Sequence, residues 1–356
     1  MSEILFIVGA RPQFIKLAPL TKRLPDYLNF KILHTGQHYD YNMSDQFFDD
    51  LKIPTPDFNL GIGSSTHGRQ TGEMLTAIEE VLLKESINLV IVFGDTNSTI
   101  AGALAAVKLS IPTIHIEAGL RSFNRTMPEE INRVLTDHTS DYLFAPTQIA
   151  MNNLKAEGLE NKSIFTGDIM VDSLKDNLNQ ATRKKQLLEN LQINDEDFFL
   201  LTLHRPYNVD DPEKLSSILD KLSRLENPII FPAHPRTQQI IQKNDLIPDS
   251  HIRITNPLGY LDFISLEAAA NKIITDSGGI QKEAYILKTP CLTIRPETEW
   301  IETVDCGWNK LLDVDDPDFI ETIKLFAPPI NHENIFGNKV ADHMVDIINR
   351  ICKNPD

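Results

Sequence analysis

Titratable and glycine-rich segments follow nearly every short apolar run of this sequence, and their residue types are those that bind anions and move protons. In the first half of the chain these segments are Gly9–Pro12, His34–His38, Gly94–Thr96 and Glu117–Arg121. In the second half they are His204–Pro206, His234–Arg236, Asp276–Gly279 and Arg295. If the apolar runs are parallel strands, these segments lie at strand carboxyl ends, where open α/β sheets bind their ligands. We therefore predict a polar ligand site built from strand ends.

The segment Asp276-Ser277-Gly278-Gly279 has the composition of a phosphate-binding turn. It follows the apolar run Ile273–Thr275 and precedes an amphipathic stretch, Ile280–Leu287. Glycines let a phosphate approach the backbone, and a helix start offers free N–H groups and partial positive charge. An ordinary helix cap with a tight turn is the alternative. If the turn binds phosphate, Glu283 lies one turn further on and is placed to accept ribose hydroxyls.

Three basic residues are candidates for binding a diphosphate. Arg11 directly follows the first apolar run, and Lys16 lies about one helical turn beyond it. An arginine binds phosphate through a planar, bidentate fork, although Arg11 could instead cap its own loop. Arg295 comes from the second half of the chain, where it follows the run Cys291–Ile294.

Asp95, Glu117 and Glu129 lie at predicted strand or helix ends rather than on solvated helix faces. A carboxylate that ends a buried strand is either paired with a base or shifted in pKa. Taken one at a time, these acids could be structural, through salt bridges to Arg121 or Arg133 or through the helix dipole at Glu129. Together with His204 they are typical of a proton-transfer set.

Several function classes are disfavoured. The formal net charge of −16 argues against binding nucleic acid or an anionic membrane, which requires a basic face. Neither a Walker sequence nor GxGxxG occurs, so no nicotinamide cofactor is indicated. The histidines lack metal-ligand spacing, and the pair His34 and His38 has no third ligand, so we expect no metal.

The pattern of apolar runs predicts an α/β fold with two Rossmann-like domains and a ligand cleft between them. The predicted helices include Gln70–Lys84, Ser98–Leu109, Pro212–Leu225 and Tyr260–Ala270. The predicted strands are Ile4–Val8, Lys31–Leu33, Leu89–Phe93, Thr113–Ile116, Tyr142–Phe144, Phe199–Leu203, Pro228–Phe231, Ile252–Ile254, Lys272–Thr275 and Cys291–Ile294. We place the N-terminal domain at residues 1–170, the C-terminal domain at 171–335, and a last helix at 336–356 that packs back on the N-terminal domain.

The length of 356 residues suits two domains. Cys291, Cys306 and Cys352 form no CxxC pair, which favours a reducing cytoplasm. The N-terminal apolar run is too short for a secretory signal, and no run reaches the roughly 18 apolar residues of a membrane span.

These motifs, in this order, resemble the non-hydrolysing UDP-N-acetylglucosamine 2-epimerases over essentially the whole chain. The matching segments are Gly9–Pro12 with Ile15–Pro19, Gly94–Thr96, Glu117–Arg121, Pro128–Arg133 and Thr275–Glu283. The resemblance implies the two-domain GT-B-like fold that one class of glycosyltransferases shares, with UDP in the interdomain cleft. It also implies a homodimer that uses neither NAD nor a metal.

The resemblance assigns roles position by position. It makes Asp95, Glu117 and Glu129 the acid/base carboxylates and places His204 beside the diphosphate. It makes Arg11, Lys16, Ser277, Gly278 and Gly279 phosphate contacts, Glu283 the ribose ligand, and Phe263 a neighbour of the uracil. The predicted substrate-binding set also includes Arg133, which ends the segment Pro128–Arg133, and the strand-end residues His234 and Arg295.

The chemistry expected of this family is an elimination, because carbon 2 of the sugar has no adjacent ketone to stabilise a carbanion. One residue removes the carbon-2 proton while UDP leaves carbon 1, giving a 2-acetamidoglycal. UDP then adds back, and an acid protonates the opposite face. A retaining glycosyltransferase, a hydrolysing epimerase and a UDP-sugar-binding regulator are the alternatives.

Two departures from the family pattern bear on substrate and regulation. Thr298-Glu299-Trp300-Ile301-Glu302 replaces Thr-Glu-Arg-Pro-Glu and, with Gln13-Phe14, resembles the branch acting on UDP-2,3-diacetamido-2,3-dideoxyglucuronate. The segment Gln37–Asp45 differs from the family's regulatory segment, and its Asp40 and Asp45 add negative charge. Because like charges oppose binding of a second diphosphate, we predict weak activation by substrate.

Overall fold

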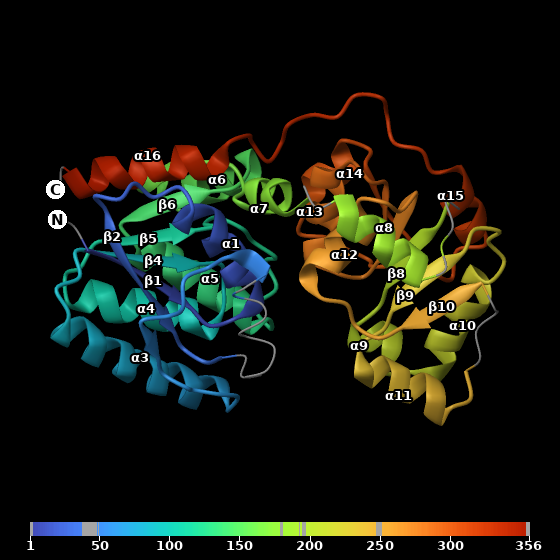
Figure 1. Cartoon of the computed structure of the whole chain (residues 1–356), viewed down its shortest axis with the longest axis horizontal. Coiled ribbons are helices and arrows are strands. Elements are labelled where there is room, and N and C mark those ends of the chain that lie inside the picture. Colours follow the sequence, from blue (N-terminus) through green and yellow to red (C-terminus); the bar gives the residue numbers. More distant parts are fainter. Residues whose placement is uncertain are drawn as a thin grey trace. The chain divides into compact units, whose positions relative to one another are not determined.

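The computed structural model describes residues 3–37, 48, 50–178, 181–191, 193, 197–246 and 251–353, with only the backbone for 181–185. His38 and the segment Tyr39–Asp45, on which the prediction about regulation rests, lie outside the described residues. The chain divides into two compact units, residues 1–176 with 334–356 and residues 177–333 (Figure 1).

The described part of the first unit contains a seven-stranded, wholly parallel sheet in the order β3-β2-β1-β4-β5-β6-β7. Its strands are β1 (Glu3–Val8), β2 (Asn29–His34), β3 (Phe58–Asn59), β4 (Leu89–Phe93), β5 (Thr113–Ile116), β6 (Tyr142–Ala145) and β7 (Ser163–Phe165). Its helices are α1 (Arg11–Thr21), α3 (His67–Lys84), α4 (Asn97–Lys108), α5 (Pro128–Thr139), α6 (Gln148–Ala156), the 3-10 helix η1 (Glu160–Lys162), α7 (Met170–Leu178) and α16 (Val340–Lys353).

The second unit, as far as it is described, contains a six-stranded parallel sheet in the order β10-β9-β8-β11-β12-β13. Its strands are β8 (Phe199–Thr202), β9 (Ile229–Pro232), β10 (Ile252–Thr255), β11 (Lys272–Thr275), β12 (Cys291–Thr293) and β13 (Asn309–Leu311). Its helices are α8 (Ala181–Asn190), α9 (Pro206–Val209), α10 (Pro212–Leu222), α11 (Pro235–Lys243), α12 (Tyr260–Glu267), α13 (Gly278–Leu287), α14 (Ile301–Asp305) and α15 (Phe319–Leu325). The α/β fold with two Rossmann-like sheets is thereby confirmed.

Close packing of helix α4 against the first sheet rests on small residues. Ala101, Ala103, Ala105 and Ala106 are fully buried on this helix. A Cβ at Gly102 would lie 2.9 Å from the Ile7 side chain, so the helix backbone approaches the sheet closely there. Tight packing of this kind fixes the position of the loop that precedes the helix.

The last helix, α16, belongs to the first unit, where it packs against α1 (Figure 1). Its inner face is apolar and includes the fully buried Val340, Ala341 and Ile348. The Ala341 N–H donates a 3.0 Å hydrogen bond to the Asp172 carboxylate on α7. The polypeptide therefore returns to its first unit after completing the second.

Strand order reverses once in each sheet, between β1 and β4 in the first and between β8 and β11 in the second. Connections leave the sheet in opposite directions at such a point, which opens a crevice at the carboxyl ends of the two strands. Arg11 and Asp95 follow the first pair of strands, and His204 and Asp276 follow the second. Predicted site residues thus lie at the topological switch point of each sheet.

Candidate functional site

An ion pair between Lys16 and Glu117 occupies the carboxyl edge of the first sheet. Lys16 extends from α1, and its side chain is only 9% exposed, while Glu117 follows β5 and is 12% exposed. The backbone of Glu117 takes a φ of +76°, which is rare for a residue with a side chain. Its N–H and that of Ala118 both donate to the Phe144 carbonyl, at 3.1 and 3.0 Å, and hold this conformation.

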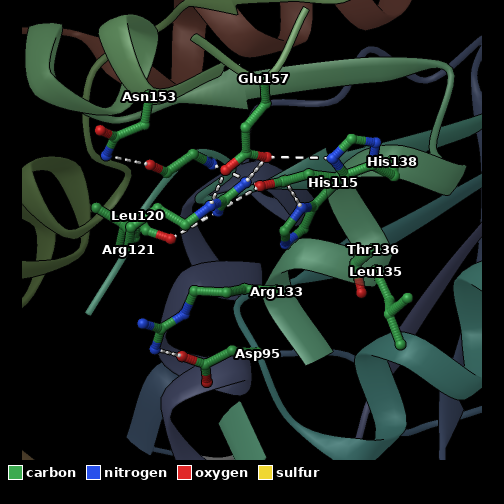
Figure 2. A network of polar contacts seen from close by, with 12 residues as sticks. Asp95, His115, Leu120, Arg121, Arg133, Leu135, Thr136, His138, Asn153 and Glu157 are labelled. Carbon is green, nitrogen blue, oxygen red and sulfur yellow. Dashed lines mark hydrogen bonds and ion pairs between the residues drawn. The ribbon is translucent and has the colours of Figure 1, made fainter. Parts of the chain in front are cut away.

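Asp95, at the end of β4, forms an ion pair with Arg133 on α5 (Figure 2). Burial works against the charge of Arg133, yet its pKa is raised above the ordinary value, because Asp95 first and then Glu130 and Glu117 favour the cation. A Cβ at Gly94 would lie 3.2 Å from Glu117 Oε2, so the two strand ends are close. The structure therefore brings Asp95, Glu117 and two cations together.

Two adjacent acids on α5 have opposite environments. Glu129 is exposed, whereas Glu130 is 3% exposed and accepts hydrogen bonds of 2.9 Å from Ser122 N, Ser122 Oγ, Phe123 N and Arg133 Nη1. Burial alone would raise the pKa of Glu130, but these donors outweigh it and lower that pKa. Glu130 is thus a structural anion that supports Arg133, and the proton-transfer role of Glu129 stays a prediction.

A network of charged and polar side chains joins β5, α5 and the end of α6 (Figure 2). His115 is fully buried and contacts the Asp137 carboxylate through Nδ1 at 2.6 Å and the Gly94 carbonyl through Nε2 at 2.7 Å. Arg121 binds Asp137 at 2.7 Å and Glu157 at 2.7 Å. The sequence left open that the candidate acids form salt bridges with Arg121 or Arg133. The structure shows such a salt bridge for Asp95 with Arg133, whereas Arg121 binds Asp137 and Glu157 instead.

In the second unit, the His204 ring contacts the Asp276 carboxylate, with 2.9 Å between His204 Nδ1 and Asp276 Oδ1. Asp276 is fully buried and also accepts the N–H groups of His204 and Arg205 and the Asn208 amide, at 3.0 to 3.1 Å. Burial would raise the pKa of Asp276, but the hydrogen bonds from His204 and Asn208 lower it. Asp276 is therefore an ionised anchor that orients His204, whose side chain is 51% exposed.

The turn Ser277–Gly279 follows Asp276, and α13 begins at Gly278. Gly278 is buried, and a Cβ there would overlap the Glu299 carboxylate and lie 3.5 Å from Arg295 Nη1. Glu299 binds Arg295 with 2.9 Å between Oε2 and Nη1. The structure thus brings Arg295 beside the first glycine of the predicted phosphate turn.

Three further predicted residues of the second unit, Glu283, Phe263 and His234, each contact different neighbours. Glu283, on α13, meets the fully buried Glu267 of α12. Phe263 is half-buried and packs against a cluster that includes Leu266 and Ile273. His234 is exposed and caps α11 by accepting a 3.3 Å hydrogen bond from the backbone of the same helix. The uracil, ribose and substrate roles of these three residues stay predictions.

Sequence reasoning missed several residues that organise the site, namely Gln13, His115, Glu130, Asp137, Glu267 and Glu299. The Gln13 side chain, 1% exposed, accepts the Gly9 N–H at 2.7 Å and donates to the Phe93 carbonyl at 2.8 Å, linking the ends of β1 and β4. One signal was available: Asp137 lies four residues after Arg133, a spacing that puts two residues on one face of a helix.

Within the described residues, no group of three or more His, Cys, Asp or Glu side chains could hold a metal ion. No helix in the same part of the chain is long and apolar enough to cross a membrane.

The structure of the UDP-GlcNAc 2-epimerase from Methanocaldococcus jannaschii, determined in complex with UDP-GlcNAc and UDP, superimposes with a TM-score of 0.86. It is 46% identical, and the match covers 98% of this chain and 99% of the other. This similarity places the molecule among the two-domain α/β enzymes that resemble GT-B glycosyltransferases.

Two curated relatives have different names. A UDP-N-acetylglucosamine 2-epimerase homolog from Methanococcus maripaludis is 52% identical over 92% of this chain and 93% of its own length. The UDP-2,3-diacetamido-2,3-dideoxy-D-glucuronate 2-epimerase of Pseudomonas aeruginosa is 48% identical over 87% and 88%. A family model described as UDP-N-acetylglucosamine 2-epimerase matches residues 22–349. The chain belongs to the UDP-N-acetylglucosamine 2-epimerase family, as its motifs predicted.

Proposed function

We propose that this protein is a non-hydrolysing UDP-N-acetylglucosamine 2-epimerase, which interconverts UDP-GlcNAc and UDP-ManNAc through a 2-acetamidoglycal. The observation that carries the proposal is the pairing of two carboxylates with two cations at neighbouring strand ends, Asp95 with Arg133 and Glu117 with Lys16. Inversion at an unactivated carbon requires proton transfer on both faces of the ring, and several carboxylates can supply it without a redox cofactor. Membership of the epimerase family supports the same reaction.

The second unit is assigned to the UDP group. The N–H groups at the start of α13 and the Arg295 guanidinium suit a diphosphate, whose negative charge grows as UDP leaves carbon 1. His204, oriented by the ionised Asp276, is a further donor for this leaving group. Glu283 is assigned to the ribose and Phe263 to the uracil.

The first unit is assigned to the sugar ring. Asp95, Glu117 and Glu129 are the candidate acids and bases, and Arg11 and Lys16 are candidate partners of the diphosphate. Lys16 is paired with Glu117, so the same ammonium is available both to a phosphate oxygen and to a carboxylate that exchanges a proton. That arrangement would couple departure of UDP to proton transfer at carbon 2.

A second candidate substrate is UDP-2,3-diacetamido-2,3-dideoxyglucuronate. Trp300, one of the residues shared with that branch, is buried, and the Lys282 ammonium lies 4.6 Å from the centre of its ring. Such a cation–π contact fixes a basic residue one position before the proposed ribose ligand Glu283. The 48% identity to the P. aeruginosa enzyme supports this candidate too.

Incubation with each UDP-sugar alone, followed by ion-exchange chromatography, tests the proposal. We expect one substrate to give its 2-epimer, still attached to UDP, until a constant ratio is reached. Free UDP accumulating with free sugar would indicate a hydrolysing enzyme. An unchanged substrate that is consumed only after a sugar acceptor is added would indicate a glycosyltransferase. The ratio of kcat/KM values for the two UDP-sugars then identifies the substrate.

We also expect a homodimer in the cytoplasm. The family resemblance supports the dimer, and the three free cysteines suit a reducing compartment. Light scattering of the purified protein measures the oligomeric state.

A further inference from the structure

Both ring nitrogens of His115 face groups that can only accept a hydrogen bond. Nε2 lies 2.7 Å from the Gly94 carbonyl oxygen, and Nδ1 lies 2.6 Å from Asp137 Oδ1. A carbonyl oxygen has no proton to donate. The ring is fully buried, so solvent does not take the place of either partner.

Asp137 is held in its ionised form. Burial would raise its pKa, but His115 first and Arg121 second outweigh burial and lower that pKa. The carboxylate also accepts the Gly119 N–H at 3.0 Å and contacts Arg121 Nη1 at 2.7 Å. With the Gly94 carbonyl on one side and a carboxylate held by Arg121 and the Gly119 N–H on the other, both ring nitrogens of His115 are placed to donate.

Three residues of helix α5 hold the Gly94–Asp95 turn in place. Arg133 pairs with the Asp95 carboxylate, and Asn132 Nδ2 donates to the Asp95 carbonyl at 3.0 Å (Figure 2 shows the Arg133 pair). Asp137, one helical turn after Arg133, reaches the same turn through His115 and the Gly94 carbonyl. The backbone and side chain of Asp95 are thus fixed from two directions.

We propose that His115, held by Asp137, is a positioning residue that sets the orientation of the Asp95 carboxylate through the Gly94 carbonyl. This inference rests on the proposed epimerase function of Asp95. The same Asp137 carboxylate holds Gly119, two residues after Glu117. One buried unit therefore ties together the two loops that bear the candidate acids.

Two substitutions of His115 test its two hydrogen bonds one at a time, because each keeps one bond and removes the other. In His115→Asn, the amide nitrogen falls near the position of Nδ1, so the contact with Asp137 is kept and that with Gly94 is lost. In His115→Gln, the amide nitrogen falls near Nε2, so the contact with Gly94 is kept. We expect His115→Asn to lower kcat about 10- to 100-fold with KM changed less than about 3-fold, because misplacement by about 1 Å costs this much. We expect His115→Gln to lower kcat by less than about 5-fold.

A double-mutant cycle with Asp95→Asn distinguishes positioning from a general loss of structure. If His115 acts through Asp95, the double variant Asp95→Asn with His115→Asn is no slower than Asp95→Asn alone. Independent, multiplicative losses would overturn the proposal, as would equal kcat losses in His115→Asn and His115→Gln. His343→Gln is the matched control, since His343 is an exposed histidine on α16.

NMR of the wild-type protein tests the proposal without measuring turnover and without any variant. In wild-type protein labelled with 15N-histidine, the fully buried ring of His115 should show two slowly exchanging N–H protons. A single ring proton would overturn the proposal even if the enzyme is an epimerase. Conversely, two ring protons with no reaction of any UDP-sugar would contradict the proposed function and leave the His115 geometry intact.

Discussion

Lys16 and Glu117, 101 residues apart in the sequence, form an ion pair at the carboxyl edge of the first sheet. Glu117 makes this contact from a backbone conformation with φ of +76°, which costs energy for any residue with a side chain. Strain of this kind persists where the surrounding structure fixes it, here through two hydrogen bonds to the Phe144 carbonyl. The carboxylate is therefore held in place before any substrate binds.

Asp95→Asn and Glu117→Gln should each slow epimerisation by about 100- to 10,000-fold, the usual contribution of a general acid or base. Both substitutions keep the size of the side chain, so affinity for UDP should change little. Glu80→Gln, on the exposed face of α3, is the control. Turnover by NMR and UDP binding by calorimetry are the measurements. Near-normal turnover in both variants would remove these residues from the proton-transfer set.

The neighbours Glu129 and Glu130 should separate catalysis from stability. Glu129→Gln changes an exposed side chain, so we expect an unchanged melting temperature and, if Glu129 transfers a proton, a large loss of turnover. Glu130→Gln removes a buried anion that accepts four hydrogen bonds, which should cost about 1–3 kcal/mol of stability. Measurements of thermal unfolding and of kcat on both variants distinguish the catalytic role from the structural one. Loss of stability in Glu129→Gln would show that the exposed side chain has a structural role.

Adjacent glycines of the predicted phosphate turn should respond differently to alanine. A methyl group at Gly278 overlaps the Glu299 carboxylate and displaces the residue that holds Arg295, so we expect UDP affinity to fall by about 10-fold or more. Nothing in the described part of the chain lies within 4 Å of a Cβ at Gly279, and Gly279→Ala keeps the backbone N–H. Calorimetric titration with UDP compares the two. Equal affinities would argue against a nucleotide at this turn.

Glu267 should make the stability of the fold decrease with rising pH. Burial first, and Glu283 second, raise the pKa of Glu267 well above its ordinary value of 4.5. Above that ordinary value the folded state retains a proton that the unfolded chain releases, so the free energy of unfolding falls as pH rises towards the folded pKa. Each unit of pKa difference corresponds to about 1.4 kcal/mol.

Glu267→Gln is neutral at every pH. Relative to wild type, we expect the variant to become more stable between pH 5 and pH 8, by about 1 kcal/mol or more. Urea unfolding at the two pH values measures the difference. Glu80→Gln, whose side chain is exposed, should show no such trend. Parallel pH dependence of wild type and Glu267→Gln would mean that Glu267 is ionised in the folded protein.

The interior strands were predictable because they are continuous apolar runs. The predicted bounds Leu89–Phe93, Thr113–Ile116 and Lys272–Thr275 are those of β4, β5 and β11. The strands β3, β7 and β13 were missed, and each lies at the outer edge of its sheet. They are two or three residues long and partly exposed, so they carry no apolar run. The edge strand β10 carries an apolar run and was predicted as Ile252–Ile254, whereas strands as short and exposed as these three are defined only by pairing with a neighbour, which a local pattern does not contain.

The pairing of side chains was harder to predict than their placement. The carboxyl-end position of Asp95 and Glu117 follows from the strand pattern, but their choice of Arg133 and Lys16 depends on how helices cross the sheet. The adjacent acids Glu129 and Glu130 have the same local sequence, and only tertiary packing decides which is buried. His115 lies inside an apolar strand, where a buried histidine gives no sign of its partners.

Proton NMR of UDP-GlcNAc and its diacetamido-glucuronate counterpart in deuterated water, with the wild-type protein, tests the central claim most directly. Removal and return of the carbon-2 proton must exchange it with solvent. We predict that one substrate loses its carbon-2 proton signal while its 2-epimer appears with deuterium at the same carbon and UDP attached. Tight binding of UDP with every carbon-2 proton retained would contradict the account and indicate a protein that binds UDP-sugars without epimerising them.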